Sequence, residues 1–180
     1  MGYAEIFLVG GTVGTWALVG VTRWLAKGQL SVLKGQLSIA QEQRKIQLYL
    51  ELRKDFDGHL IEHRKILARQ FLENAHADEI NEPVVNFFED MGMLLRRDLL
   101  DHDMIWDTFS YYARMWRSAC RDYIAKVRVD LGGDETLFTD FDYLSERMCE
   151  AEARKRGKTR GELEPSPSQL KTFLEAEAAL

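Results

Sequence analysis

The chain has 180 residues, of which 46% are hydrophobic, and it carries a formal net charge of −5. This acidic balance provides no strong positive field for phosphates and therefore argues against nucleic-acid binding. The two cysteines, Cys120 and Cys149, have neither metal-ligand spacing nor the density of a disulfide scaffold, which indicates a reducing compartment.

The first predicted element is an uncharged apolar run at residues 6–22. As a helix it spans roughly 26 Å, and the flanking Tyr3 and Trp24 bring it to the thickness of a hydrocarbon core and lie at the two interfaces. A cleaved signal peptide would carry basic residues before the run, and a buried core helix would show a polar face. We therefore expect residues 1–26 to be a single transmembrane anchor.

The basic residues predict the orientation of that anchor. Arg23, Lys27 and Lys34 follow the run and no Lys or Arg precedes it, so the positive-inside rule places the N-terminus outside and the rest in the cytoplasm. Residues 23–70 hold 10 Lys+Arg against 5 Asp+Glu, whereas residues 71–180 hold 14 against 23. The basic portion next to the anchor is expected to contact anionic membrane lipid.

A helical stalk is predicted over residues 27–57, because KGQLS occurs at 27–31 and again one heptad later at 34–38. The heptad positions are apolar at first and polar at the last two, so the predicted coiled coil is short. A G-x-x-x-G spacing inside the anchor would let two membrane helices approach closely. Together these patterns favour a parallel homodimer; the alternative is a stalk that packs on its own domain. The residues concerned are Gly10 and Gly14 in the anchor, and Leu30, Leu33, Leu37, Ala40, Arg44 and Gln47 in the stalk.

A compact cytoplasmic helical bundle is expected over residues 58–156. Capping and turn residues divide it into helices at 59–74, 84–97, 101–130 and 136–156, with Asp101 as the N-cap of the third. No segment shows sustained strand alternation, so the predicted fold class is all-α, with enough residues for one core. The third helix is the predicted centre of that core, because apolar residues recur along it at spacings of three and four: Ile105, Phe109, Tyr112, Trp116, Ala119, Tyr123 and Val127.

The last 24 residues, 157–180, are expected to form a flexible linker and a short tail helix. Pro165 and Pro167 mark the linker, and Ser168 is the predicted cap of a helix at 169–179. The small apolar face of that helix is compatible both with docking on a partner and with fraying in solution.

Three stretches carry a resemblance to a known family: YLELRKDF at 49–56, NFFEDMGMLLRRDLLDHDMIWDTFSYYARMW at 86–116 and FDYLSERM at 141–148. With them the chain resembles the bacterial domain of unknown function 4760 over about residues 45–148. The resemblance implies a helical fold in a small protein with one N-terminal membrane helix at the bacterial inner membrane, and it implies no mechanism. The recurring features of the family map to Phe88, Glu89, 98–103, Tyr112, Arg114 and Trp116 and resemble a core pattern more than an active site.

The sharpest chemical pattern is the string HLIEH at 59–63. In inverted zincin peptidases an H-x-x-E-H string places two imidazoles on zinc with the Glu as general base. Here His59 and His63 would need a third ligand, for which Glu135 and Glu146 are the candidates. We favour the alternative, a solvent-facing helix start, and assign no metal or cofactor.

Two clusters of charged residues have both a structural and a ligand-binding interpretation. Four residues at the start of the predicted central helix, Asp98, Asp101, His102 and Asp103, form an oxygen-rich turn that suits a hard cation, but helix capping accounts for them without one. An arginine row further along the same helix could receive an anionic ligand or partner, or could pair with Glu89 and Asp90 of the preceding helix. The row consists of Arg114, Arg117, Arg121 and Arg128.

Two functions from different classes follow. The favoured one is a single-pass, membrane-tethered scaffold or adaptor that binds a cytoplasmic or membrane-complex protein. The alternative is a membrane-anchored zinc hydrolase that uses the His59 and His63 pair. The interaction candidates are Gly10, Gly14, Leu30, Leu33, Leu37, Arg114, Arg117 and Arg121.

Overall fold

The computed structural model describes the backbone of residues 3–73 and 80–180 and the side chains of residues 27–73 and 80–180. Over these residues the regular secondary structure is helical throughout, which confirms the all-α prediction. The chain divides into two compact units, residues 1–44 and 45–180. The first helix, α1 (Tyr3–Asp57), begins in the first unit and ends in the second.

The first unit consists of the N-terminal part of α1. Its described side chains, residues 27–44, are all exposed. No helix in the described part of the chain is long and apolar enough to cross a membrane. The side chains of the expected span at 6–22, with Gly10 and Gly14, lie outside the described residues, and the structure lends the expected anchor no support.

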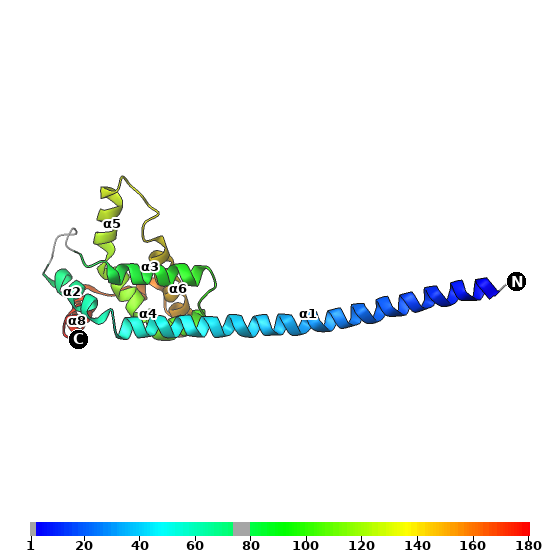
Figure 1. Ribbon diagram of the computed structural model, residues 1–180. Helices are drawn as coiled ribbons and strands as arrows, with labels where there is room; N and C mark the ends of the chain where they lie inside the picture. Colours follow the sequence, from blue (N-terminus) through cyan, green and yellow to red (C-terminus); the bar gives the residue numbers. More distant parts are fainter. Residues whose placement is uncertain (1–2, 74–79) are drawn as a thin grey trace. The chain divides into compact units, whose positions relative to one another are not determined.

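The second unit is a helical bundle built around α6, which packs against both α3 and α4, while α8 packs against α2 (Figure 1). It contains the C-terminal part of α1 from residue 45 onward. Its other helices are α2 (Ile61–Leu72), α3 (Pro83–Arg96), α4 (His102–Ala119), α5 (Arg121–Asp130), α6 (Thr139–Arg156), α7 (Arg160–Leu163) and α8 (Pro167–Ala178).

Aromatic rings join distant segments in the core of this bundle. Phe56, at the end of α1, lies edge-on to Phe109 of α4 with ring centroids 5.3 Å apart. Phe88 of α3 stacks on Phe141 of α6 at 5.1 Å. Edge-to-face and offset-stacked arrangements are those that aromatic pairs prefer. Phe56 also lies edge-on to Phe88, at 6.1 Å, and joins the two pairs. These contacts hold the C-terminal part of α1 together with α3, α4 and α6.

The predicted central helix is two helices in the structure. α4 ends at Ala119 and α5 begins at Arg121. Between them Cys120 has ψ 2°, which departs from the value of about −42° in a regular α-helix and opens the turn. Hydrogen bonds from Cys120 N to Trp116 O and from Ile124 N to Cys120 O still cross the junction, at 2.9 Å each. The apolar stripe therefore continues through it. Trp116 is fully buried as predicted, and so is Cys120.

The C-terminal segment is more ordered than the sequence suggested. The stretch expected to be a flexible linker contains α7, and α8 is capped by Ser166 rather than by the expected Ser168. The physical reason is Pro167, which is favoured at the first position of a helix and so places the cap one residue before it. α8 buries Phe173 and Leu174, and Phe173 lies edge-on to Trp116 with ring centroids 5.2 Å apart. The tail helix is thus part of the bundle core.

Candidate interaction sites

The leucine seam, defined as Leu30, Leu33 and Leu37, lies on α1 within the first unit. The heptad spacing places the three side chains on one face of the helix. They are 55%, 60% and 60% exposed, and the nearby Val32 and Ile39 are 62% and 60% exposed. Large apolar side chains with so little cover, on consecutive turns, are typical of a surface that meets a partner.

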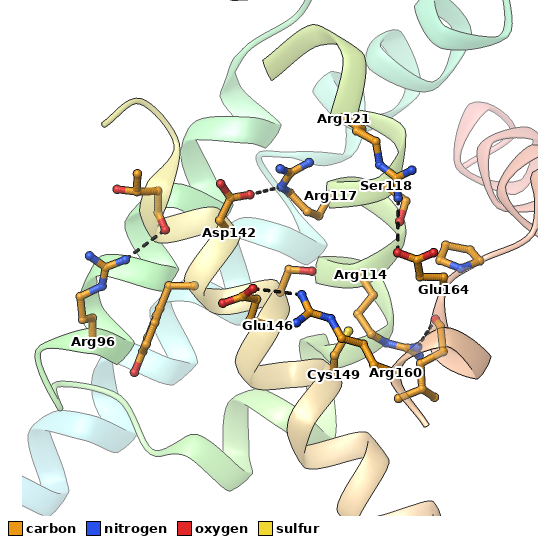
Figure 2. Close-up of a pocket in the computed structure, with 15 residues that line it drawn as sticks. Arg96, Arg114, Arg117, Ser118, Arg121, Asp142, Glu146, Cys149, Arg160 and Glu164 are labelled. Atoms are coloured by element: carbon orange, nitrogen blue, oxygen red, sulfur yellow. Dashed lines mark hydrogen bonds and ion pairs between the residues drawn. The ribbon is translucent and has the colours of Figure 1, made fainter. Parts of the chain in front are cut away.

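A cavity of about 520 Å³ in the second unit brings the predicted arginines together (Figure 2). Arg114, Arg117 and Arg121 all line it, whereas Arg128 does not. Sequence reasoning missed Arg96 of α3 and Arg160 of α7, which line the same cavity. Arg160 was missed because it falls in the stretch expected to be a linker. We call this cavity, with its five arginines, the arginine pocket.

Two of the five arginines are held inside the pocket wall. Arg117 Nε donates to Asp142 Oδ1, and Arg128 Nη2 donates to the other oxygen of the same carboxylate at 2.8 Å. Arg114 donates to the backbone oxygens of Ser110 and Leu163, at 3.3 and 3.0 Å. The side chains of Arg114 and Arg117 are only 14% and 20% exposed. These arginines therefore tie α4 to α6 and to α7.

Two other arginines lie at the solvent-exposed rim of the pocket. Arg160 Nη2 lies 3.0 Å from Glu146 Oε1, and this pairing raises the pKa of Arg160. Arg121 Nη2 lies 3.8 Å from Glu164 Oε1. All four side chains are more than half exposed, and exposed pairs of this kind stabilise a fold by only about 0–1 kcal/mol.

The carboxylates that pair with the arginine row are not the ones expected. The sequence pointed to Glu89 and Asp90, but in the structure the partners are Glu152 for Arg114, Asp142 for Arg117 and Arg128, and Glu164 for Arg121. Glu89 instead accepts the backbone N–H groups of Phe141, at 2.6 Å, and Asp140, at 3.3 Å. It thus supplies from α3 the acceptor that the first turn of α6 needs, since the residue preceding α6 provides no side-chain cap. Burial raises the pKa of the Glu89 carboxyl, and the two backbone hydrogen bonds oppose that rise.

The pocket also contains neutral polar groups. The hydroxyl side chains Ser118, Thr139 and Ser145 line it. Cys149 lines it as well, but burial raises the pKa of its thiol, which disfavours the nucleophilic thiolate. Cys149 is therefore poorly suited to act as a nucleophile in this pocket.

Three of the remaining chemical candidates, His63, Asp101 and Asp98, have structural partners. His63 Nδ1 lies 2.9 Å from Asn81 Oδ1, and His59 lies just before α2. Asp101 caps α4 by accepting the Met104 N–H, as predicted. Asp98 pairs with Lys45 at 2.9 Å. Among residues 27–73 and 80–180, no group of three or more His, Cys, Asp or Glu side chains is arranged to hold a metal ion.

The fold and its pocket define an all-helical bundle domain in which five arginines line one cavity. The chain belongs to the family described as Domain of unknown function (DUF4760), which matches residues 6–148. This match confirms the resemblance found in the sequence and extends it toward the N-terminus. No curated protein and no solved structure matches the chain.

Proposed function

We propose that this protein is a single-pass, membrane-tethered helical scaffold of the bacterial inner membrane. The run at 6–22 would anchor it, and the bundle would face a cytoplasmic or membrane-complex protein partner. The uncharged run and the basic residues on one side of it support this orientation. Deleting residues 1–26 should release the chain from membranes, and a C-terminal reporter on the full chain should be cytoplasmic. Membrane retention or a periplasmic reporter would contradict the anchor.

The observation that carries the proposal is the exposure of the leucine seam. Burying one such side chain stabilises an assembly by about 1.5–3 kcal/mol, so several on one helix provide a strong drive to associate. The partner that fits best is a second copy of the chain. Two parallel copies bring the identical KGQLS repeats into register, and Gly10 and Gly14 would allow the same pair of helices to approach closely in the membrane.

The test of this self-association replaces seam residues by acids. In the purified full chain in detergent, Leu33→Glu combined with Leu37→Glu should convert a dimer into a monomer, because the seam would then bury like charges. The matched control is Ser31→Glu combined with Ser38→Glu, which adds the same charge at exposed positions one heptad apart, off the seam. Sedimentation measures the mass of each species. A monomeric parent, or a dimeric seam variant, would exclude the homodimer.

A further inference from the structure

The side chains that line the arginine pocket carry more positive than negative charge, in an otherwise acidic part of the chain. Five arginines line it against three carboxylates, Asp142, Glu146 and Glu164. Two further carboxylates lie just outside the lining: Asp140 is 2.8 Å from Arg96 and Glu152 is 4.0 Å from Arg114. Asp142 is shared with Arg128, which also lies outside the lining. Residues 71–180 as a whole carry 14 Lys+Arg against 23 Asp+Glu. More than a third of these Lys and Arg residues therefore line one cavity, although the segment as a whole has more acidic than basic residues.

Four of the five arginines form two groups that differ in how much stability the fold would lose if their present contacts were broken. The fifth, Arg96, is bound to Asp140 at 2.8 Å and to the Thr139 backbone oxygen at 3.0 Å. Arg114 and Arg117 are mostly buried and hold the helices together, so their positions are fixed by the fold. Arg121 and Arg160 are 62% and 71% exposed and pair with carboxylates that are themselves 69% and 55% exposed. Exchanging these exposed carboxylates for the oxygens of an incoming anion would cost the fold little.

The size and lining of the pocket limit the kind of anion. A volume of about 520 Å³ lies within the range of roughly 300–1,000 Å³ typical of small-molecule sites. A guanidinium group presents a planar fork of donors that matches phosphate oxygens two at a time. Fixed arginines deep in the wall and exchangeable ones at the rim can engage more than one phosphate group. The hydroxyls of Ser118 and Ser145 provide further donors to phosphate oxygens, whereas Thr139 Oγ1 already donates to the Thr136 backbone oxygen at 3.1 Å.

We propose that the arginine pocket binds a soluble small molecule that carries two or more phosphate groups. The fixed arginines, Arg114 and Arg117, would receive one phosphate group. Arg121 and Arg160 would leave Glu164 and Glu146 and close on the other. This site is independent of the anchor and of the leucine seam, so a monomer would bind the ligand as well as a dimer would.

Binding of pyrophosphate to the purified full chain, measured by calorimetry, tests the proposal. The parent should bind it saturably, and Arg121→Ala combined with Arg160→Ala should weaken binding at least about tenfold, because two charge-assisted contacts are lost. Glu164→Gln should tighten binding, because it removes a competing carboxylate. The matched control is Arg147→Ala, another half-exposed arginine of an exposed pair that does not line the pocket, and it should bind like the parent.

Several outcomes would overturn the proposal. Absence of pyrophosphate binding by the parent at millimolar concentration would do so, as would equal affinity in the parent and the Arg121/Arg160 variant. Glycerol 3-phosphate, the single-phosphate unit of anionic lipids, is the second probe. If it bound as tightly as pyrophosphate, the pocket would recognise one phosphate of the kind found in a lipid headgroup, and the claim of a ligand with two phosphates would fail.

Discussion

The two units of this chain differ in the exposure of their large apolar side chains. In the first unit the leucine seam is more than half exposed, whereas in the second Phe88, Phe109 and Trp116 are fully buried. The second unit therefore contains its own core. In residues 27–44 the described apolar side chains lack such cover, so they can contribute hydrophobic stabilisation only when something else covers them.

The units differ in their charges as well. Lys27 and Lys34 of the first unit are exposed. The second unit buries an ion pair in which Arg64 Nε and Nη2 donate to the two carboxylate oxygens of Glu177, at 2.6 and 2.7 Å. The Arg64 guanidinium also lies over the Phe56 ring, 4.0 Å from its centroid. A buried bidentate pair between α2 and α8 shows that the tail is integrated into the core rather than laid on its surface.

The largest expected effect is the loss of stability when a large apolar side chain of the second unit is replaced by alanine, compared with the same replacement in the first unit. Trp116→Ala should lower the free energy of unfolding of the bundle by about 3–5 kcal/mol, because it leaves a cavity at a fully buried site. Leu33→Ala, at a 60% exposed position, should leave that unfolding transition unchanged. Chemical denaturation followed by circular dichroism measures both. If Trp116→Ala were as stable as the parent, Trp116 would not be part of a packed core, and the two units would not differ in the burial of their apolar side chains.

The next effect concerns the buried pair that holds the tail. Glu177→Ala should destabilise the bundle by about 3 kcal/mol, because it leaves the Arg64 guanidinium buried without its carboxylate. The control on the same helix is Glu175→Ala, which removes only an exposed carboxylate 3.8 Å from Lys171 and should change stability by about 0.5 kcal/mol or less. Thermal melts of the two variants provide the comparison. Equal melting temperatures would mean that α8 is dispensable to the core.

The elements that sequence reasoning predicted are those with a local signal. The three-and-four spacing predicted the buried stripe, and Asp101 was identified as a cap because capping depends on neighbouring residues alone. The break at Cys120 has no such signal, since hydrogen bonds and apolar spacing both continue across it. The docking of α8 depends on Arg64 and Glu177, which are 113 residues apart, and no local pattern joins them.

The arginine pocket was predicted in part, for the same reason. Arg114, Arg117 and Arg121 share a face by helical spacing, so the sequence could group them. Arg96 and Arg160 join them only through the packing of α3 and α7 on α6. The partners of the row also depended on tertiary structure: Glu89 serves as a substitute cap for α6, which leaves Asp142 to pair with Arg117 and Arg128.

The smallest expected effect comes from replacing one glycine by alanine in each unit. The replacement should destabilise the second unit and stabilise the helix of the first. A Cβ atom at Gly92 of α3 would lie 1.9 Å from the backbone oxygen of Asp140, where α3 crosses α6. Backbone cannot yield as a flexible side chain can, so Gly92→Ala should push the two helices apart and cost about 2 kcal/mol of bundle stability. At Gly35 of the first unit a Cβ atom would meet nothing within 4 Å. There Ala favours the helix over Gly by about 1 kcal/mol, so Gly35→Ala should slow amide hydrogen exchange around residue 35.

Chemical denaturation measures the stability of the Gly92→Ala variant, and hydrogen exchange measures the local effect of Gly35→Ala. If Gly92→Ala were as stable as the parent, the close crossing of α3 and α6 would be wrong. If Gly35→Ala exchanged faster, residues 27–44 would need the glycine for close approach to a second helix, and the uncovered face would then already be occupied in solution.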